Sequence, residues 1–191
     1  MKVKMDEQNF IEQNNIYVID PESPKYPTSI HKVRKKLPKI YHMGQLFEYD
    51  DGIAVVGTRK CSENGQLFAQ NIGKLLSENN YKVVSGLAKG IDTFAHSGCL
   101  ENNGLTIAVL AWFHELSPKS NKELLEKIIE TGCALSENLF SPPEEPKYEF
   151  LKRDEIIASL SNAVVVVETR SKGGAKYTAD IAKRKKIPVI I

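Results

Sequence analysis

IAVVGTR, residues 53–59, is the stretch around which the rest of this chain is organised. Its four apolar residues, 53–56, form a short and mostly β-branched run, which predicts a strand, and Gly57 directly after them predicts a turn. A helical pattern begins at about Ser62. Strand, glycine turn and helix in this order predict the opening of a βαβ unit.

The predicted turn has the chemistry of an anion site. Backbone N–H groups at the start of a helix lack intrahelical partners and favour anions. Gly57 lets a ligand approach the backbone closely, and the planar guanidinium of Arg59 suits phosphate. We therefore predict that a phosphate-bearing ligand docks at Gly57, Thr58 and Arg59. The alternative, a tight turn beside a solvated arginine, stays open because one glycine is not a dinucleotide-binding fingerprint.

Apolar strands alternate with amphipathic helices from residue 52 to the end of the chain. Strands are expected at residues 53–56, 81–85, 105–110, 134–136, 163–167 and 188–191, and helices at 66–77, 91–100, 121–130, 149–160 and 178–185. This alternation predicts an α/β fold with a doubly wound, mostly parallel sheet. The continuous apolar runs 53–56 and 163–167 predict central strands that are buried on both faces.

The first 51 residues are predicted to form a short N-terminal lead-in that packs on the core domain of residues 52–191. Residues 1–15 are polar and predict a frayed segment or one weak helix. A short strand is expected at 16–19 and a short edge strand at 39–43. Pro21, Pro24 and Pro27 break regular structure after the first of them. The lead-in has too few apolar residues to form a core of its own.

Composition excludes several classes of protein. With 41% hydrophobic and 26% charged residues, the chain is typical of globular proteins. No apolar run approaches the roughly 20 residues of a membrane span, and the N-terminus lacks a signal core, so we expect a cytoplasmic protein without a membrane partner. The three cysteines are widely spaced without a CxxC pair, so no metal site is expected.

Two short basic runs stand out against a net charge of only +2. They are HKVRKK at residues 31–36 and KRKK at residues 183–186. Such runs are usually solvated faces of helices or loops. They indicate nucleic-acid binding only if the fold gathers them beside the site.

Further glycine turns are expected at the same edge of the sheet as Gly57, because the carboxyl ends of parallel strands meet there. These candidate phosphate-binding residues are Ser85, Gly86 and Lys89 after the second strand, and Gly173 and Gly174 in the loop SKGGAKY, residues 171–177. Several glycine turns around one crevice suit phosphates and a sugar. No acidic residue ends the second strand, which argues against NAD, and no cofactor is predicted.

Asp92 and His96 lie four residues apart and so share one face of a predicted helix. One interpretation is a histidine–aspartate pair for base catalysis. The other is a helix-start acceptor beside a packed imidazole. We favour the structural interpretation because no nucleophilic serine or cysteine stands in a recognisable motif with them, and we predict no catalytic residue and no enzyme activity.

The segment KYEFLKR, residues 147–153, mixes cations with Tyr148 and Phe150. Aromatic rings interleaved with basic residues are typical of single-stranded nucleic-acid binding, in which bases stack on rings and phosphates meet cations. The alternative is the start of an amphipathic helix with Phe150 in the core. Spacing alone leaves both interpretations open.

Several of these motifs together resemble one family over about residues 26–191. They are VVGTR (55–59), VVSGLAKGIDTFAH (83–96), TIAVLA (106–111), LSE (135–137) and FLKRDEIIASLSNAVVVVE (150–168). This set resembles the DNA-processing protein A family, also called DprA or Smf. The resemblance implies an extended Rossmann fold that binds single-stranded DNA in DNA uptake and recombination, forms homodimers and hands the strand to RecA, with no established catalysis and no metal.

The resemblance also assigns roles to residues. The family's pocket residues match Arg59, Lys147, Phe150 and Arg153, so Phe150 would stack a base while the three cations hold phosphates. Asp154 and Glu155 stand where the family has an amide and a cation, and we expect them to weaken phosphate binding. The chain stops near where the family continues its domain and often adds a winged-helix domain, so RecA loading is less expected than the fold.

Two other functions remain as alternatives. The same broad fold occurs in nucleotide-binding proteins and in phosphoribohydrolases, which the chain also resembles and whose glycine loop reads near PGGxGT with a following Glu. Here Gly173 and Gly174 are present without that continuation, which weighs against hydrolysis. The third possibility is an interaction module that keeps the fold but binds neither ligand.

Overall fold

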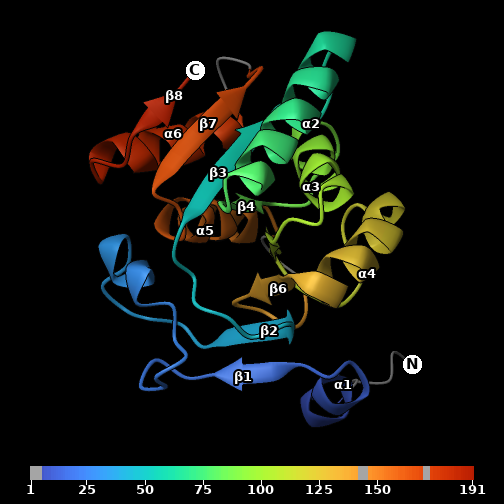
Figure 1. Ribbon diagram of the computed structural model, residues 1–191. Coiled ribbons are helices and arrows are strands. Elements are labelled where there is room, and N and C mark those ends of the chain that lie inside the picture. The colour runs from blue at the N-terminus through green and yellow to red at the C-terminus, as the bar shows by residue number, and fades with distance from the viewer. Residues whose placement is uncertain (1–5, 142–145, 170–172) are drawn as a thin grey trace.

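A computed structural model describes residues 6–141, 146–169 and 173–191 (Figure 1). Part of the predicted frayed segment, the middle of the expected proline-rich loop at 141–146 and the first residues of the glycine loop lie outside these ranges. Eight strands form one sheet in the order β1-β2-β6-β5-β4-β3-β7-β8. In chain order they are β1 Tyr17–Ile19, β2 Ile40–Gly44, β3 Gly52–Gly57, β4 Lys82–Ser85, β5 Thr106–Val109, β6 Cys133–Ser136, β7 Ala163–Val167 and β8 Val189–Ile190.

The six strands from β6 to β8 pair in parallel, while β1 and β2 are antiparallel to their neighbours. The helices, including two short 3₁₀ turns, are α1 Glu7–Gln13, η1 Thr28–Lys32, α2 Glu63–Glu78, α3 Ile91–Glu101, η2 Lys119–Asn121, α4 Lys122–Thr131, α5 Pro146–Ser159 and α6 Gly174–Arg184. The predicted α/β fold with a mostly parallel, doubly wound sheet is confirmed.

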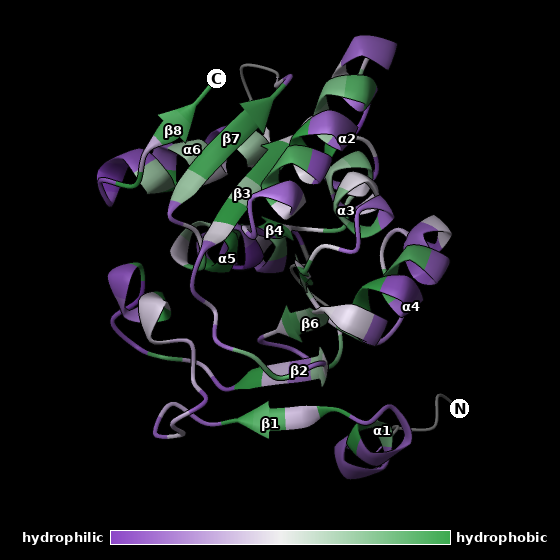
Figure 2. Ribbon diagram, viewed as in Figure 1, coloured by the Kyte–Doolittle hydropathy of each residue, from purple (hydrophilic) through white to green (hydrophobic). Residues whose placement is uncertain are grey.

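Alternate residues of the strands pack against two different layers of helices, because successive side chains of a strand point to opposite faces of the sheet. Ala54 and Val56 pack in the layer that contains α5, α6 and η1. Val55 packs with α2 and α3, and a further cluster joins α4 and α1 to β5 and β6. Figure 2 shows the resulting pattern of apolar central strands under helices with mixed outer faces.

The two most apolar strands occupy inner positions of the sheet. β3 lies between β4 and β7, and β7 lies between β3 and β8. Their register pairs Ile53 with Ala163 and Gly57 with Val167. The prediction that these two strands are central is confirmed, and their carboxyl ends open side by side on the cavity described below.

The lead-in contributes more to the sheet than the sequence indicated. The prediction of an edge strand at 39–43 is wrong about its position, since β2 lies inside the sheet, paired with β1 on one side and β6 on the other. Burial explains this. Ile40 and His42 are fully buried, and the imidazole nitrogens of His42 lie 2.9 Å from the Tyr49 hydroxyl and 3.0 Å from the Gln45 carbonyl oxygen.

Arg34 links the lead-in to the far half of the chain. Its Nη1 lies 2.8 Å from Glu137 Oε1 at the end of β6, and its Nε lies 2.7 Å from Glu155 Oε2 on α5. Its Nη2 also donates to the Lys152 carbonyl oxygen at 3.1 Å. Glu155 is therefore neutralised by Arg34 rather than directed at a phosphate, which corrects the expected repulsion from this residue.

None of the helices in the described ranges has both the length and the apolar content that a bilayer crossing needs. Over the same ranges, no group of three or more His, Cys, Asp and Glu side chains is placed to hold a metal ion.

Candidate nucleic-acid interface

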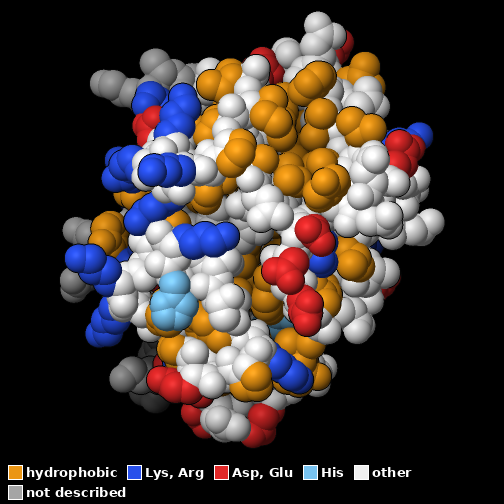
Figure 3. All heavy atoms as spheres, turned by 60° about the vertical axis from the view of Figure 1, so that its left-hand side comes forward, with side chains coloured by type: hydrophobic (Ala, Val, Ile, Leu, Met, Phe, Trp, Pro, Cys, Tyr) orange, Lys and Arg blue, Asp and Glu red, His pale blue; other side chains and the backbone are white. Residues whose placement is uncertain are grey.

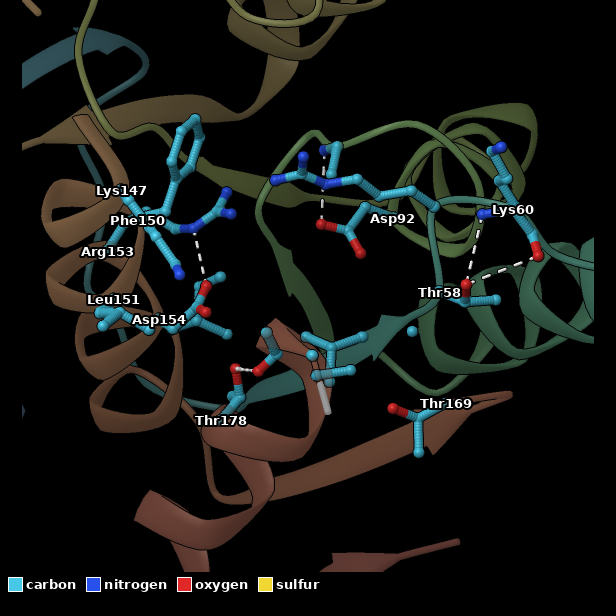
Figure 4. Close-up of a pocket in the computed structure, with 18 residues that line it drawn as sticks. Thr58, Lys60, Asp92, Lys147, Phe150, Leu151, Arg153, Asp154, Thr169 and Thr178 are labelled. Carbon is cyan, nitrogen blue, oxygen red and sulfur yellow. Dashed lines mark hydrogen bonds and ion pairs between the residues drawn. The ribbon is translucent and has the colours of Figure 1, made fainter. Parts of the chain in front are cut away.

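A cavity of about 700 Å³ lies between α5 and the turn that follows β3, at the carboxyl ends of β3 and β7 (Figure 4). It brings together eight of the predicted site residues: Gly57, Thr58, Arg59, Lys147, Phe150, Arg153, Gly173 and Gly174. A smaller cavity of about 170 Å³ beside it contains Gly86 and Lys89 and shares Arg59, Phe150 and Arg153 with it. Of the predicted residues, Ser85 lines neither.

The turn after β3 is fixed by close backbone packing. A Cβ on Gly57 would lie 2.0 Å from the Val167 carbonyl oxygen and 2.4 Å from Ile91 Cγ1, so no larger residue fits. The Thr58 N–H donates to the Glu168 carbonyl oxygen at 2.8 Å. The turn is therefore held between β7 and α3, and it directs Arg59 into the cavity.

The start of α2 is not the open anion site that its position after Gly57 suggested. Ser62 caps the helix by accepting from the Gly65 N–H at 3.0 Å, and Glu168 Oε2 accepts from the Ser62 N–H at 2.9 Å. A carboxylate thus already occupies the positive end of this helix dipole. The anion chemistry of the turn rests on the Arg59 side chain instead.

The N-terminus of α6 lies at the main cavity, whereas the N-terminus of α2 is capped by Ser62 and Glu168. The N-cap residue of α6, Gly173, has no side chain that could cap the helix, and both Gly173 and Gly174 are exposed and line the main cavity. A Cβ on Gly173 would meet no atom of the described residues within 4 Å. A Cβ on Gly174 would lie 3.0 Å from Asp154 Oδ2, so the first backbone N–H groups of α6 face the cavity beside this carboxylate, and a phosphate can approach them from the side of Gly173.

Two guanidinium groups lie close to the Phe150 ring. The guanidinium carbon of Arg59 is 5.4 Å from the centroid of this ring, and that of Arg153 is 5.7 Å away. The Trp112 ring meets it edge-on at a centroid distance of 5.2 Å. These separations suit cation–π and edge-to-face contacts. The ring remains partly exposed at the cavity, so Phe150 is not the core residue of the alternative interpretation.

Arg153 lies beneath the cavity surface, with a side chain only 7% exposed. Its Nη1 donates to the carbonyl oxygens of Gly86 and Val109, at the ends of β4 and β5, and its Nε lies 2.9 Å from Asp154 Oδ1. A Cβ on Gly86 would lie 1.9 Å from Arg153 Nη1, which explains the glycine there. The geometry makes Arg153 a support that joins the strand ends to α5.

Asp154 is buried beside Arg153 and is 5% exposed. Burial raises the pKa of its carboxyl group to about 6, although the Arg153 guanidinium opposes this shift. Together Arg153 and Asp154 form a compensated pair in the cavity wall. Asp154, which was expected to weaken phosphate binding, is therefore already in contact with a cation.

Ser85 faces the core rather than a ligand. Its side chain is fully buried and its hydroxyl donates to the Val55 carbonyl oxygen at 2.6 Å. The prediction that it contacts phosphate is not compatible with this position, because the residue ends β4 with its side chain directed at β3. The next residues differ in exposure, since Gly86 is buried whereas Lys89 is exposed at the smaller cavity.

Asp92 and His96 have separate partners. The Asp92 carboxylate accepts from the Gly86 N–H at 3.1 Å, and burial raises its pKa. His96 Nδ1 lies 2.6 Å from Thr106 Oγ1, which itself donates to the Val83 carbonyl oxygen. Burial, with a smaller contribution from Arg153, lowers the pKa of His96 to about 3. This arrangement favours the structural interpretation of both residues.

The residues that line or support the cavity without having been predicted from the sequence include Lys60, Thr178 and Trp112. Lys60 and Thr178 line the main cavity, and Trp112 supports the Phe150 ring. Trp112 comes three residues after the end of β5, at the edge where the strand ends meet, so the rule that ligands bind there could have selected it. Lys60 and Thr178 carry no comparable signal in the sequence.

The model of a protein family described as DNA recombination-mediator protein A matches residues 17–191, nearly the whole chain. The chain belongs to this family. Among relatives, Protein Smf from Synechocystis is 38% identical over 178 residues, which cover 90% of this chain and 44% of the relative. DNA processing protein DprA from Streptococcus pneumoniae is 42% identical over 134 residues, which cover 68% of this chain and 46% of the relative.

Solved structures agree with this family assignment. The crystal structure of DprA from Streptococcus pneumoniae superposes with a TM-score of 0.83 and 32% identity, over 96% of this chain and 66% of that one. DprA from Helicobacter pylori, described with a single-stranded DNA binding mode, gives a TM-score of 0.79 at 24% identity, which shows a shared fold. The chain spans about half the length of the curated relatives named above.

Proposed function

We propose that this protein binds single-stranded DNA in the main cavity, as a component of DNA processing and recombination that catalyses no reaction. The observation that carries the proposal is the contact of Arg59 with Phe150, in which a cation and a partly exposed ring face the same space. Bases of a single strand stack on such rings while their phosphates meet the neighbouring cations. Family membership and the description of the Helicobacter pylori neighbour support the same ligand.

The residues divide into two groups in this proposal. Arg59 and the exposed Lys147 meet phosphates, Phe150 stacks a base, and the N–H groups at Gly173 and Gly174 contact a further phosphate. Arg153 positions Phe150 and α5 from below. Because Asp154 is compensated by Arg153, its charge reduces the affinity for phosphate less than an unpaired carboxylate would.

Fluorescence anisotropy with three ligands tests the proposal. Labelled single-stranded oligonucleotide should bind more tightly than a duplex of the same sequence, because a duplex offers no unpaired base for Phe150. Free nucleotides should compete weakly. Equal or tighter duplex binding would contradict the proposal, and tight binding of a free nucleotide with no oligonucleotide binding would favour the nucleotide-handling alternative.

Assembly and partners form a second part of the proposal. We infer a homodimer, supported by three apolar side chains of α2, Leu67, Phe68 and Leu75, each more than half exposed. Sedimentation over a range of concentrations tests it, and Phe68→Glu should shift the equilibrium toward the monomer. Transfer of the strand to RecA rests on family membership alone, and a RecA strand-exchange assay with and without this protein tests it.

A cytoplasmic location is the third part of the proposal. Three free cysteines support it, two of them buried with thiol pKa values raised by burial. Such thiols are typical of a reducing compartment. Cell fractionation tests the location directly.

A further inference from the structure

Helix α5 separates the main cavity from a second hollow on its other side. Lys147, Leu151 and Asp154 line the main cavity, whereas their next neighbours in sequence, Tyr148, Lys152 and Glu155, line the second. The second hollow has a volume of about 370 Å³. We call it the α5 groove, and it is lined by Arg34, Lys36, Leu37, Pro38, Tyr148, Lys152 and Glu155.

The charges in the α5 groove leave one cation available. Arg34 is paired with Glu155 within the groove and with Glu137 behind it, and Lys152 is paired with Glu149 at 2.8 Å. Lys36 is exposed and forms no ion pair with any residue that the structure describes. The residues that line the groove include three cations and one carboxylate, and the partner carboxylates Glu137 and Glu149 balance the remaining charge. The unpaired cation, Lys36, lies on the wall opposite α5.

Tyr148 offers an aromatic surface in the same groove. Its side chain is 54% exposed although most large apolar residues of the chain are buried. Lys152 Nζ lies 4.8 Å from the centroid of its ring, so a cation already holds the ring against the helix. The α5 groove thus combines an exposed aromatic ring with a lysine, as the main cavity combines Phe150 with Arg59.

Lys147 lies where the two hollows meet. It is exposed in the first turn of α5, lines the main cavity and directly precedes Tyr148. Among the described residues it also forms no ion pair. A chain that leaves the main cavity past Lys147 reaches the α5 groove after crossing one helix, which is about 10 Å wide.

The two basic runs of the sequence flank this path. Helix α5 packs between η1, whose last turn and following residues carry the run at 31–36, and α6, whose end carries the run at 183–186. Figure 3 brings this side of the molecule forward and shows Lys and Arg side chains gathered along it. The first run contributes Lys36 to the lining of the α5 groove, and the second lies at the end of α6, the other helix that packs on α5, so the field of both runs attracts a polyanion toward this helix.

We propose that a single strand bound in the main cavity continues past Lys147 into the α5 groove, where a base stacks on Tyr148 and a phosphate meets Lys36. This second subsite rests on the proposed single-stranded DNA binding, which it extends from one stacking platform to two. Its occupant is nucleic acid because the groove repeats the pairing of ring and cation on the same helix.

Oligonucleotides of two lengths separate the subsites. One of about 4 nucleotides fills the main cavity only, and one of about 16 nucleotides also reaches the groove, as these lengths span the site sizes of single-strand-binding folds. Tyr148→Ala should weaken binding of the longer strand about fivefold or more and leave the shorter one unchanged. Lys36→Ala should reduce the slope of log K against log salt by about 0.7 for the longer strand alone.

Matched controls come from exposed residues remote from the groove. Tyr81→Ala removes an exposed tyrosine beside the amino end of β4, and Lys127→Ala removes an exposed lysine of α4, which lies on the opposite side of the molecule in Figure 1. Both should leave binding of either oligonucleotide unchanged. Since Tyr148 and Lys36 are exposed, their variants should also keep the wild-type melting temperature.

Each outcome bears on one of the two proposals. If Tyr148→Ala weakens both lengths equally, or neither, while Arg59→Ala weakens both, the second subsite is wrong and the main cavity stands. If the control variants lose as much affinity as the groove variants, the effect is one of general charge or surface and the subsite is likewise wrong. If the wild-type protein binds neither oligonucleotide, the proposed function itself fails.

Discussion

Arg59 and Phe150 come from opposite walls of the main cavity and meet with the guanidinium carbon 5.4 Å from the ring centroid. Because the ring orients the guanidinium, we expect the two residues to act together in binding. The double variant Arg59→Ala, Phe150→Ala should lose less binding free energy than the two single variants lose together. We expect the difference to be about 0.5–1 kcal/mol. Oligonucleotide dissociation constants for the four proteins of this cycle measure the coupling, and strict additivity would contradict it.

The two residues should respond differently to salt. Arg59→Ala should reduce the slope of log K against log salt by about 0.7, since one phosphate contact is lost. Phe150→Ala should cost roughly 1–3 kcal/mol of binding free energy while leaving the slope unchanged, because stacking releases no counterion. A salt titration of both variants measures this, with Lys127→Ala as the control. An unchanged slope in Arg59→Ala would remove the phosphate assignment at this turn.

Gly57 and Gly173 line the same cavity but differ in the room around them. A Cβ on Gly57 would meet a backbone oxygen at 2.0 Å, whereas one on Gly173 would meet no atom within 4 Å in the part of the chain that the structure describes. Gly57→Ala should therefore lower the melting temperature strongly. Gly173→Ala should leave it unchanged and weaken binding only, by crowding the approach of phosphate to α6. Thermal melts and anisotropy titrations of both variants decide this, and a Gly173→Ala protein with full affinity would place the ligand elsewhere.

His96 should make stability depend on pH. Its folded-state pKa of about 3 lies below the unfolded value of 6.5, so only the unfolded state takes up a proton between these values and stability falls as pH falls. From about pH 7.5 to about pH 5 this costs roughly 2 kcal/mol.

The variant His96→Ala isolates this effect. It should be less stable than the wild type at about pH 7.5, because a buried side chain and its bond to Thr106 are lost, and the gap should narrow at about pH 5. The opposite dependence from Asp154, whose pKa is raised, is common to both proteins and cancels in the difference. Urea unfolding at the two pH values measures the gap, and a constant gap would show that His96 is not held neutral.

The lead-in should not fold alone. Tyr26, Ile30 and Ile40 are buried in the same cluster as residues of α5 and β3. The two carboxylates that pair with Arg34, those of Glu137 and Glu155, also lie outside the lead-in. A peptide of residues 1–51 should therefore show no cooperative melt by circular dichroism. A cooperative transition in that peptide would mean that residues 1–51 and 52–191 are separate folding units.

The parallel sheet could be predicted because its signals are local. The apolar runs at 53–56 and 163–167 have no polar face, so burial on both sides was the only consistent interpretation. The inner position of β2 carries no such signal. It depends on the pairing of β2 with β6, about ninety residues later, and on the partners of His42.

The cavity was predicted in outline and not in detail. Motif spacing and family resemblance brought Arg59, Lys147 and Phe150 together, because strand ends and helix starts meet at one edge. The spacing of motifs in the sequence does not show which side chains and helix ends remain available to a ligand. That Glu168 occupies the start of α2, and that Arg153 is buried, follow from contacts between residues distant in sequence.

Arg34 and the two carboxylates that it contacts are synthesised far apart in time. Arg34 is synthesised 103 residues before Glu137 and 121 residues before Glu155. At typical rates of translation, the second interval takes roughly 6 to 24 seconds. Once residue 59 has been added, the nascent chain carries Arg34 and the glycine turn of β3, but it still lacks the helix that brings the Phe150 ring to that turn. The turn is thus exposed on the ribosome well before a stacking surface exists opposite it.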